Sequence, residues 1–288
     1  MKIQKISKNK MDYISSICLD PSVDKKTRDL MNTGMINRIN WIKKMSSLGL
    51  GILLAIEEPK DKTIHYRWVG KMKHSDLAVY NHVPMGLLEF MPIEHAIEPV
   101  DGENGLFINC MWILPPFWST GVGTELMNTF LDEAKKFGGG SVIAYDGDKW
   151  FETSINYMPA NFFRKFGFRE VDRNGTRVLL YLDLGNKNEP NLIAPKGEYH
   201  KGLDEIKVEI FFNYQCPWSE FMVNSVKNEM KNYPHIEFSF INTNDRKIVE
   251  KYGISRGIRI NGVPLINRMA TWKEIKTEID KIAISSSN

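Results

Sequence analysis

Cysteine is scarce in this chain. The 288 residues contain three cysteines, Cys18, Cys110 and Cys216, which lie far apart in the sequence. So few and so widely spaced thiols exclude a disulfide framework and the close ligand spacing of a structural zinc or other metal site. Reduced, unpaired thiols are typical of the cytoplasm, so we expect a cytoplasmic protein that holds no metal.

An excess of charge of one sign and a long apolar run are also missing. The net charge is only +3, and lysines and arginines are interleaved with acids, whereas a nucleic-acid-binding protein usually carries a dense basic stripe. The longest apolar stretch, residues 48–56, is much shorter than the roughly 20 residues that span a bilayer. The first ten residues lack the apolar core of a secretory signal. We therefore expect neither a nucleic-acid partner nor a membrane segment.

The chain does contain enough apolar residues for two globular domains. Apolar residues make up 42% and charged residues 25%, as in proteins that form a core. Residues 185–205 are rich in glycine, proline, asparagine and charge and have no apolar period, which predicts a linker. The prediction is a first domain over residues 1–184 and a second over residues 206–288.

The first domain has the patterns of a mixed α/β sheet flanked by helices. Residues 106–114 are apolar on both faces, as expected of a central strand. The turn signal Asn174-Gly175 predicts a closing hairpin. We expect the remaining strands at residues 2–6, 51–57, 85–91, 141–145, 169–172 and 177–184, and helices at 23–45, 122–137 and 159–166.

The second domain is predicted to be a β-α-β unit followed by a hairpin and a final helix. The turn signal Asn261-Gly262 separates the two strands of that hairpin. We expect strands at residues 208–212, 236–241, 258–260 and 263–266, and helices at 217–232, 245–252 and 271–282.

The loop between the central strand and the helix at 122–137 has the features of an anion-binding site. Gly121 and Gly123 allow the backbone to approach a ligand closely, and the following helix presents unpaired N–H groups and a positive dipole end. A Rossmann dinucleotide site would need a third glycine where Leu126 stands. The simpler alternative is a tight turn without a ligand.

Two motifs resemble those of the GNAT N-acyltransferases. The first runs from Trp112 to Gly123, and the second runs from Asn156 through Ala160 to Phe168. The resemblance covers residues 1–184 and implies that acetyl-CoA is the acyl donor. It implies that the backbone of the central strand pairs with the pantetheine arm and that the loop amides hold the pyrophosphate. The implied cofactor-binding residues are Trp112, Ile113, Leu114, Trp118, Ser119, Thr120, Gly121, Val122, Gly123, Thr124, Asn156 and Phe163.

The chain departs from the GNAT pattern at two of these positions. Trp118 stands where the family usually has arginine or glutamine. Its indole ring cannot make that polar contact but could pack against the adenine or the pantetheine. Phe163 stands where a tyrosine often donates a proton to the leaving thiolate. Either Tyr157 or Tyr145 provides that proton, or the thiolate leaves without help.

A carboxylate is expected to accept the proton of the attacking amine. Four residues near strand ends are candidates for this role, namely Glu89, Glu94, His95 and Asp146. We favour Glu94, although each of the four is also compatible with a solvated charge at a strand end. Cys110 is interpreted as a small core residue.

Cys216 is the second candidate for a catalytic residue. It precedes the first helix of the second domain, where the helix dipole would lower the pKa of its thiol. The strand order resembles the thioredoxin-like fold, and Cys216-Pro217-Trp218-Ser219 resembles monothiol glutaredoxins. Ser219 excludes a disulfide within the motif, and the sequence reads Ser255-Arg256-Gly257 where thioredoxins have a cis-proline. The alternative is an interaction module whose thiol has no function.

The combination of a GNAT domain with a small thioredoxin-like module also resembles a group of bacterial and archaeal acetyltransferases. It implies an acetyl-CoA-dependent N-acetyltransferase that acts on a primary amine, in a small molecule or a peptide. The second domain could present the acceptor or a partner to the first. The competing hypothesis is a CoA-binding thiol-redox or thiol-sensing protein that uses Cys216. The sequence leaves the identity of the acceptor open and is compatible with a homodimer.

Overall fold

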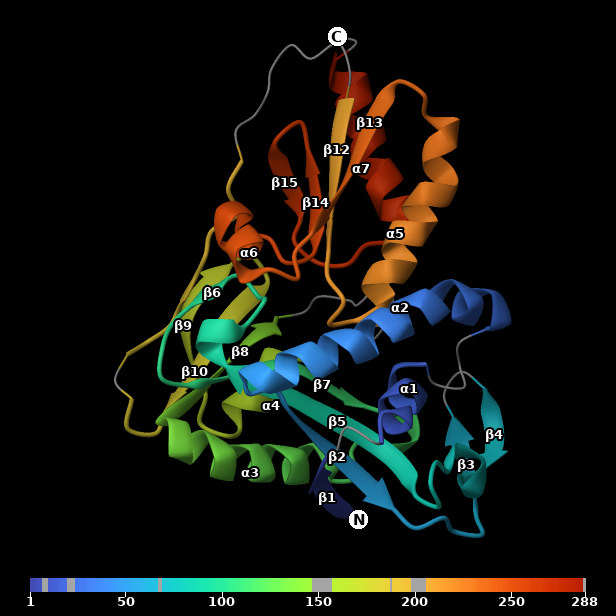
Figure 1. Cartoon of the computed structure of the whole chain (residues 1–288), viewed down its shortest axis with the longest axis vertical. Coiled ribbons are helices and arrows are strands. Elements are labelled where there is room, and N and C mark those ends of the chain that lie inside the picture. The colour runs from blue at the N-terminus through green and yellow to red at the C-terminus, as the bar shows by residue number, and fades with distance from the viewer. Residues whose placement is uncertain are drawn as a thin grey trace.

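The computed structural model describes residues 1–6, 10–19, 24–66, 69–146, 157–186, 188–197 and 206–286, with the backbone alone for 283–286. Within these residues the chain forms two main sheets of seven and four strands, each covered by helices, and two small β pairs; the four-stranded sheet lies above the seven-stranded one in Figure 1.

A seven-stranded sheet forms the first part of the chain, in the order β1-β2-β5-β7-β8-β10-β9. Neighbouring strands are antiparallel except β7 and β8, which are parallel. The sheet is therefore mixed, and the strand predicted to be central is the fourth of seven. The bounds are β1 (Lys2–Lys5), β2 (Gly51–Glu57), β5 (Val83–Pro92), β7 (Leu106–Ile113), β8 (Gly139–Tyr145), β9 (Arg169–Asn174) and β10 (Arg177–Asp183).

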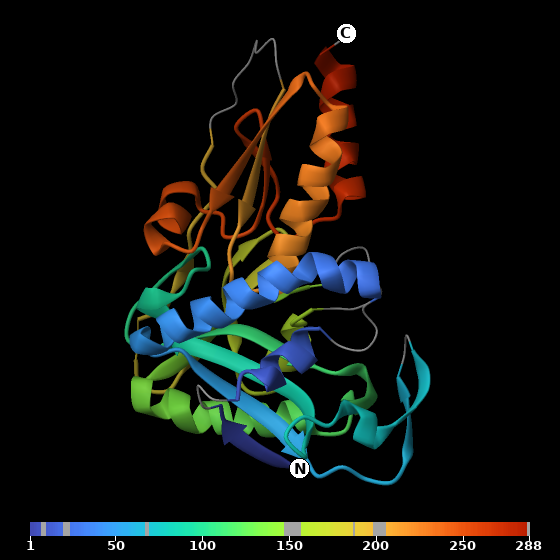
Figure 2. The same cartoon turned by 45° about the vertical axis from the view of Figure 1, so that its right-hand side comes forward.

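Helices cover both faces of this sheet. The long helix α2 (Lys25–Met45) and the short helix α1 (Asp12–Cys18) lie on one face, and α3 (Val122–Ala134) lies on the other (Figures 1 and 2). The predicted apolar stripe of α3 is buried against the sheet, and it includes Val122, Leu126, Met127, Phe130 and Ala134. Helix α4 (Ala160–Arg164) follows β8 in the chain.

Two small β pairs lie beside the main sheet. A hairpin is formed by β3 (Thr63–Tyr66) and β4 (Gly70–Lys73). A pair that the sequence did not predict joins β6 (Val100–Asp101) to β11 (Asn191–Leu192). Because β11 belongs to the predicted linker, at least part of that linker is paired with the first domain. Short 3₁₀ turns at Ile93–His95 and Pro115–Phe117 follow β5 and β7.

The second part of the chain has the predicted β-α-β unit, hairpin and final helix. Its sheet has the order β13-β12-β14-β15, in which only β12 and β13 are parallel. Helices α5 and α7 lie on one side of it and α6 on the other (Figure 2). The bounds are β12 (Ile206–Phe212), β13 (Ile236–Asn242), β14 (Gly257–Ile260), β15 (Val263–Ile266), α5 (Pro217–Glu229), α6 (Arg246–Tyr252) and α7 (Trp272–Ser286).

The two parts pack directly against each other. Helix α5 meets α2 at Gly34, where an added Cβ would lie 2.8 Å from the carbonyl oxygen of Pro217, so only glycine allows this approach. Arg246 of α6 donates hydrogen bonds to the carbonyl oxygens of Ala96 (2.6 Å) and Val100 (2.8 Å). The second part is thus docked on the face of the large sheet that carries α2.

Candidate active site

A cavity of about 490 Å³ lies where β7 ends and α3 begins. It contains most of the residues that the sequence predicted for cofactor binding. Its walls come from the end of β7, the loop before α3, and α4. The predicted residues that line it are Trp112, Ile113, Trp118, Ser119, Gly121, Val122, Gly123, Thr124 and Phe163.

The loop keeps the first turn of α3 open to this cavity. Gly121 is the residue before the helix and has φ +88°, a left-handed conformation that favours glycine. No side chain caps the helix at this end. The first backbone N–H groups of α3 therefore have no side-chain acceptor and can bind an anion together with the helix dipole.

Three predicted cofactor residues lie elsewhere or outside the described chain. Leu114 is buried, and its N–H donates to the carbonyl oxygen of Met85 at 2.9 Å, on the side of β5. Thr120 does not line the cavity, and its Oγ1 donates to the carbonyl oxygen of Phe117 at 2.7 Å. Asn156 lies outside the residues that the structure describes.

The two departures from the GNAT pattern have clear structural roles. The indole Nε1 of Trp118 donates to the carbonyl oxygen of Ile113 at 2.7 Å, so the tryptophan closes the loop back onto β7. Its ring packs edge-to-face with Trp112, with centroids 6.4 Å apart. Phe163 is fully buried and packs on Phe162 and Phe168.

Strand β7 separates from β8 next to this cavity. The parallel pairing runs only from Leu106 to Ile108. On the other side of β7, Glu89 pairs with Cys110 and Phe90 pairs with Ile108, which leaves Asn109 as an extra residue. Such a β-bulge bends the strand and interrupts pairing. Beyond the bulge, the edge of β7 that faces β8 has no strand partner among the described residues. An extended ligand could therefore pair with the free backbone groups of this edge.

A buried polar cluster lies at this bulge, on the face that carries α2. Arg38 of α2 and Glu89 of β5 form an ion pair of 3.0 Å, with 2% and 0% of their side chains exposed. Gln215, from the second part of the chain, donates to Glu89 Oε1 at 3.0 Å and to the carbonyl oxygen of Asn109 at 3.1 Å. Arg256 donates to Gln215 and pairs with Glu98. We call the five residues whose side chains make these contacts the interface cluster, namely Arg38, Glu89, Glu98, Gln215 and Arg256.

All three cysteines lie close enough to this cluster for its charges to affect the pKa values of their thiols. Burial raises the pKa of Cys18 to about 11 and also raises the pKa of Cys110. The Tyr157 hydroxyl donates to the Cys110 sulfur at 3.3 Å, and burial raises the pKa of that hydroxyl as well. These groups are therefore protonated at neutral pH.

The predicted low pKa of Cys216 is wrong. Cys216 does precede helix α5, but burial raises the pKa of its thiol, although Arg256 and Arg38 act in the opposite direction. The loss of hydration outweighs both arginines and the backbone hydrogen bond from Trp218 at the helix start, because the thiol is partly buried between the two parts of the chain. The sequence shows the helix start but not the burial.

We expect Cys216 to react slowly with alkylating reagents in the folded protein. Because its pKa is raised, the reactive thiolate should remain a minor form up to pH about 8.5, the usual pKa of a free thiol. Peptide-resolved mass spectrometry after iodoacetamide pulses at a series of pH values measures this rate, with the unfolded chain as control. A half-maximal rate near neutral pH would contradict the expectation.

The four candidate proton acceptors lie in different environments in the structure. Glu94 is exposed in the 3₁₀ turn after β5, where its Oε1 accepts from the N–H of Asn104 at 2.6 Å, and it does not line the cavity. His95 is also exposed. Asp146 pairs with Arg173 (2.8 Å) and Arg164 (3.2 Å), which lower the pKa of its carboxyl. Glu89 alone lies at the bulge.

The other members of the interface cluster, Arg38, Gln215, Arg256 and Glu98, were not predicted from the sequence. Arg38 had a recognisable signal, because it lies at helical spacing among Met31, Met35 and Ile42 on the buried face of α2. A cation on such a stripe needs a buried partner. Gln215 and Arg256 have no comparable local signal.

The described residues offer neither a metal site nor a membrane-spanning helix. They contain no group of three or more histidine, cysteine or acidic side chains arranged to hold a metal ion. None of the described helices combines the length and apolar character needed to cross a membrane.

Residues 48–168 match the sequence model of the acetyltransferase (GNAT) family. The chain is also similar to the uncharacterized N-acetyltransferase YoaP of Bacillus subtilis, with 22% identity over 165 residues. That similarity covers 57% of this chain and 64% of the relative, which is less than two thirds of the relative's length.

Solved structures that match part of this chain include two acetyltransferases. The PaiA N-acetyltransferase of Thermoplasma acidophilum, in complex with coenzyme A, has 14% identity and a TM-score of 0.37, and the match covers 64% of this chain and 99% of that one. An aminoglycoside 6'-acetyltransferase of type Ii has 13% identity and a TM-score of 0.39, with 64% and 97% covered. Together with the sequence motifs, the family match shows that residues 48–168 are similar to acetyltransferases of the GNAT family.

Proposed function

We propose that this protein is an acetyl-CoA-dependent N-acetyltransferase that transfers an acetyl group to a primary amine. The observation that supports this most is the cavity between β7 and the uncapped start of α3, within the residues that match the GNAT family. An open helix start favours a pyrophosphate, and an unpaired strand edge favours the amide-containing pantetheine arm.

In this proposal the amides from Ser119 to Thr124 bind the pyrophosphate of the donor. The backbone of Trp112 and Ile113 lines the cavity and would face the pantetheine arm. The carbonyl oxygen of Ile113 already accepts from Trp118, so we assign the tryptophan to shaping the loop. Phe163 would contribute apolar packing and no proton.

The acetyl group would lie at the bulge, where a backbone N–H of β7 stabilises the oxyanion. The amine nitrogen forms a bond with the thioester carbonyl carbon, and the carbon–sulfur bond then breaks. We assign Glu89 as the acceptor of the amine proton, because it is the one candidate carboxylate beside the bulge. Tyr157 would donate a proton to the departing thiolate, since its hydroxyl already donates a hydrogen bond to the Cys110 sulfur on β7.

We further propose that the second part of the chain is a thioredoxin-like module that completes this site. The support is its sheet order and the hydrogen bonds from Gln215 to Glu89 and Asn109. The raised pKa of Cys216 does not favour the thiol-redox alternative. In this scheme Glu94 and Cys216 have no catalytic role.

Replacing Gly121 by valine should weaken acetyl-CoA binding by about 10- to 100-fold, the value of one or two charge-assisted hydrogen bonds. A side chain at Gly121 would extend from the loop into open space where the pyrophosphate is proposed to lie, and φ +88° would be strained. Calorimetry with acetyl-CoA measures the effect.

Gly70 provides a matched control for this substitution. It also has φ +88° with open space around it, but it does not line the cavity. Gly70→Val should therefore cost similar stability and leave acetyl-CoA binding unchanged. Failure of the wild-type protein to bind acetyl-CoA at millimolar concentration would exclude the proposed function.

A further inference from the structure

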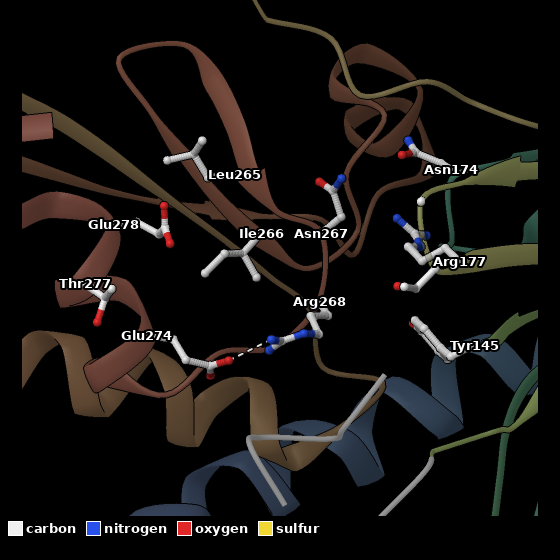
Figure 3. Close-up of a pocket in the computed structure, with 12 residues that line it drawn as sticks. Tyr145, Asn174, Arg177, Leu265, Ile266, Asn267, Arg268, Glu274, Thr277 and Glu278 are labelled. Carbon is white, nitrogen blue, oxygen red and sulfur yellow. Dashed lines mark hydrogen bonds and ion pairs between the residues drawn. The ribbon is translucent and has the colours of Figure 1, made fainter. Parts of the chain in front are cut away.

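A second cavity, of about 450 Å³, lies between the two parts of the chain. One wall is formed by the end of β8 and the turn between β9 and β10, with Tyr145 and Arg177. The facing wall is formed by the residues after β15 and the start of α7, with Asn267, Arg268 and Glu274 (Figure 3). Its size is that of a site for a small molecule.

One positive charge in this cavity has no partner among the described residues. Arg268 is neutralised by Glu274 at 2.7 Å, and Glu278 is paired with Lys281 at 2.7 Å. The side chain of Arg177 has no hydrogen bond or ion pair within the described part of the chain. Arg177 is only 7% exposed, and its Nε is buried without a hydrogen-bond partner. The cavity therefore favours an anion.

A carboxylate is the anion that fits a guanidinium best, because two parallel N–H groups match its two oxygens. The facing wall offers a second unsatisfied group, the buried Oδ1 of Asn267, which has no hydrogen-bond donor in the described chain. This oxygen can accept a hydrogen bond from an N–H. A donor fork on one wall and an acceptor on the other suit a ligand with both a carboxylate and an N–H group.

The cavity is connected to the proposed acetyl position by two tyrosines. Tyr145 lines the cavity and lies beside Arg177 in the β8–β10 pairing. Its ring packs on Tyr157 with centroids 6.1 Å apart. The hydroxyl of Tyr157 in turn reaches Cys110 beside the bulge of β7. A molecule held at Arg177 would thus lie next to the residues proposed for acetyl transfer.

We propose that this cavity binds the carboxylate of the acyl acceptor, and that the acceptor is a small amino carboxylate of the amino-acid class. The inference rests on the proposed function, because it specifies the substrate of that site. Arg177 binds the carboxylate, Asn267 accepts an N–H from the same molecule, and the amine to be acetylated extends past Tyr145 towards β7.

The test compares each of the twenty L-amino acids with its α-carboxamide as acceptor, by following release of the CoA thiol. At least one amino acid should be acetylated with a kcat/KM about 10- to 100-fold above that of its amide. In Arg177→Gln this preference should disappear through a higher KM for the acid rather than through a lower kcat. Equal or better reaction of the amides would overturn the proposal, as would the absence of transfer to any acid.

Two measurements separate this proposal from other failures. Asn267→Asp leaves Arg177 in place but adds a negative charge to the cavity, so it should also raise the KM for the acid if the fold is intact. Calorimetry with acetyl-CoA tests the proposed function independently. If acetyl-CoA does not bind, calorimetry with the same amino acids still tests the cavity. At least one amino acid should bind the wild-type protein, and it should bind Arg177→Gln more weakly. Absent binding, or equal binding to the variant, would overturn the proposal.

Discussion

Replacing Arg38 by methionine should lower the free energy of unfolding by about 3–5 kcal/mol. Arg38 and Glu89 are both almost fully buried, and the ion pair between them is 3.0 Å long. Removing the cation would leave the Glu89 carboxylate in the interior with only the amide of Gln215 as hydrogen-bond donor. Chemical denaturation followed by tryptophan fluorescence measures the loss.

Two variants control this prediction. The double variant Arg38→Met/Glu89→Leu removes both charges, so it should regain most of the lost stability, because a buried ion pair is often replaceable by apolar residues. Lys44→Met changes an exposed cation on the same helix and should alter stability by less than about 0.5 kcal/mol. A loss below about 1 kcal/mol in Arg38→Met would show that Glu89 is neutral or solvated in the folded protein.

Replacing Glu89 by glutamine should lower kcat for acetyl transfer by about 10²- to 10⁴-fold, the usual contribution of a general base. Glutamine keeps the size of the side chain and one acceptor oxygen, but it cannot take a proton from the amine. The KM for acetyl-CoA should be unchanged, because Glu89 does not line the donor cavity. Steady-state kinetics with saturating acetyl-CoA measures both quantities.

Glu94→Gln is the matched control for this prediction. Glu94 lies five positions further along the same segment, is exposed, and accepts a hydrogen bond from Asn104. Its substitution should leave kcat within about twofold of the wild type, as expected of a surface residue away from the site. If Glu94→Gln were slow and Glu89→Gln active, the original prediction from the sequence would be restored and the role of Glu89 rejected.

Both predictions depend on contacts between the two parts of the chain. Gln215 joins Glu89 to the bulge residue Asn109, and Arg256 joins Gln215 to Glu98. A module that only carried a reactive thiol would not need such buried polar contacts with the large sheet. The interface cluster is the physical basis for assigning the second part of the chain to the acetyltransferase site.

Local patterns were sufficient to predict most of the fold. The apolar stripe of α3 and the two-sided apolar run of β7 extend over whole elements, and their periods report directly on burial. Helix α1 was missed because its seven residues are too short for a repeated stripe. The β6–β11 pair was missed because each strand has two residues and forms only when distant segments meet.

The sequence by itself determined the order of strands and helices, the glycine loop before α3 and the similarity of residues 48–168 to the GNAT family, because these depend on residues that are neighbours in the chain. Only the tertiary structure decided which carboxylate lies at the bulge, that the partly buried Cys216 has a raised pKa, and that Arg177 lines a cavity without a partner among the described residues. Burial and charge pairing depend on contacts between residues far apart in the sequence, such as the contact between Gln215 and Glu89. No local sequence pattern predicts which distant residues will meet.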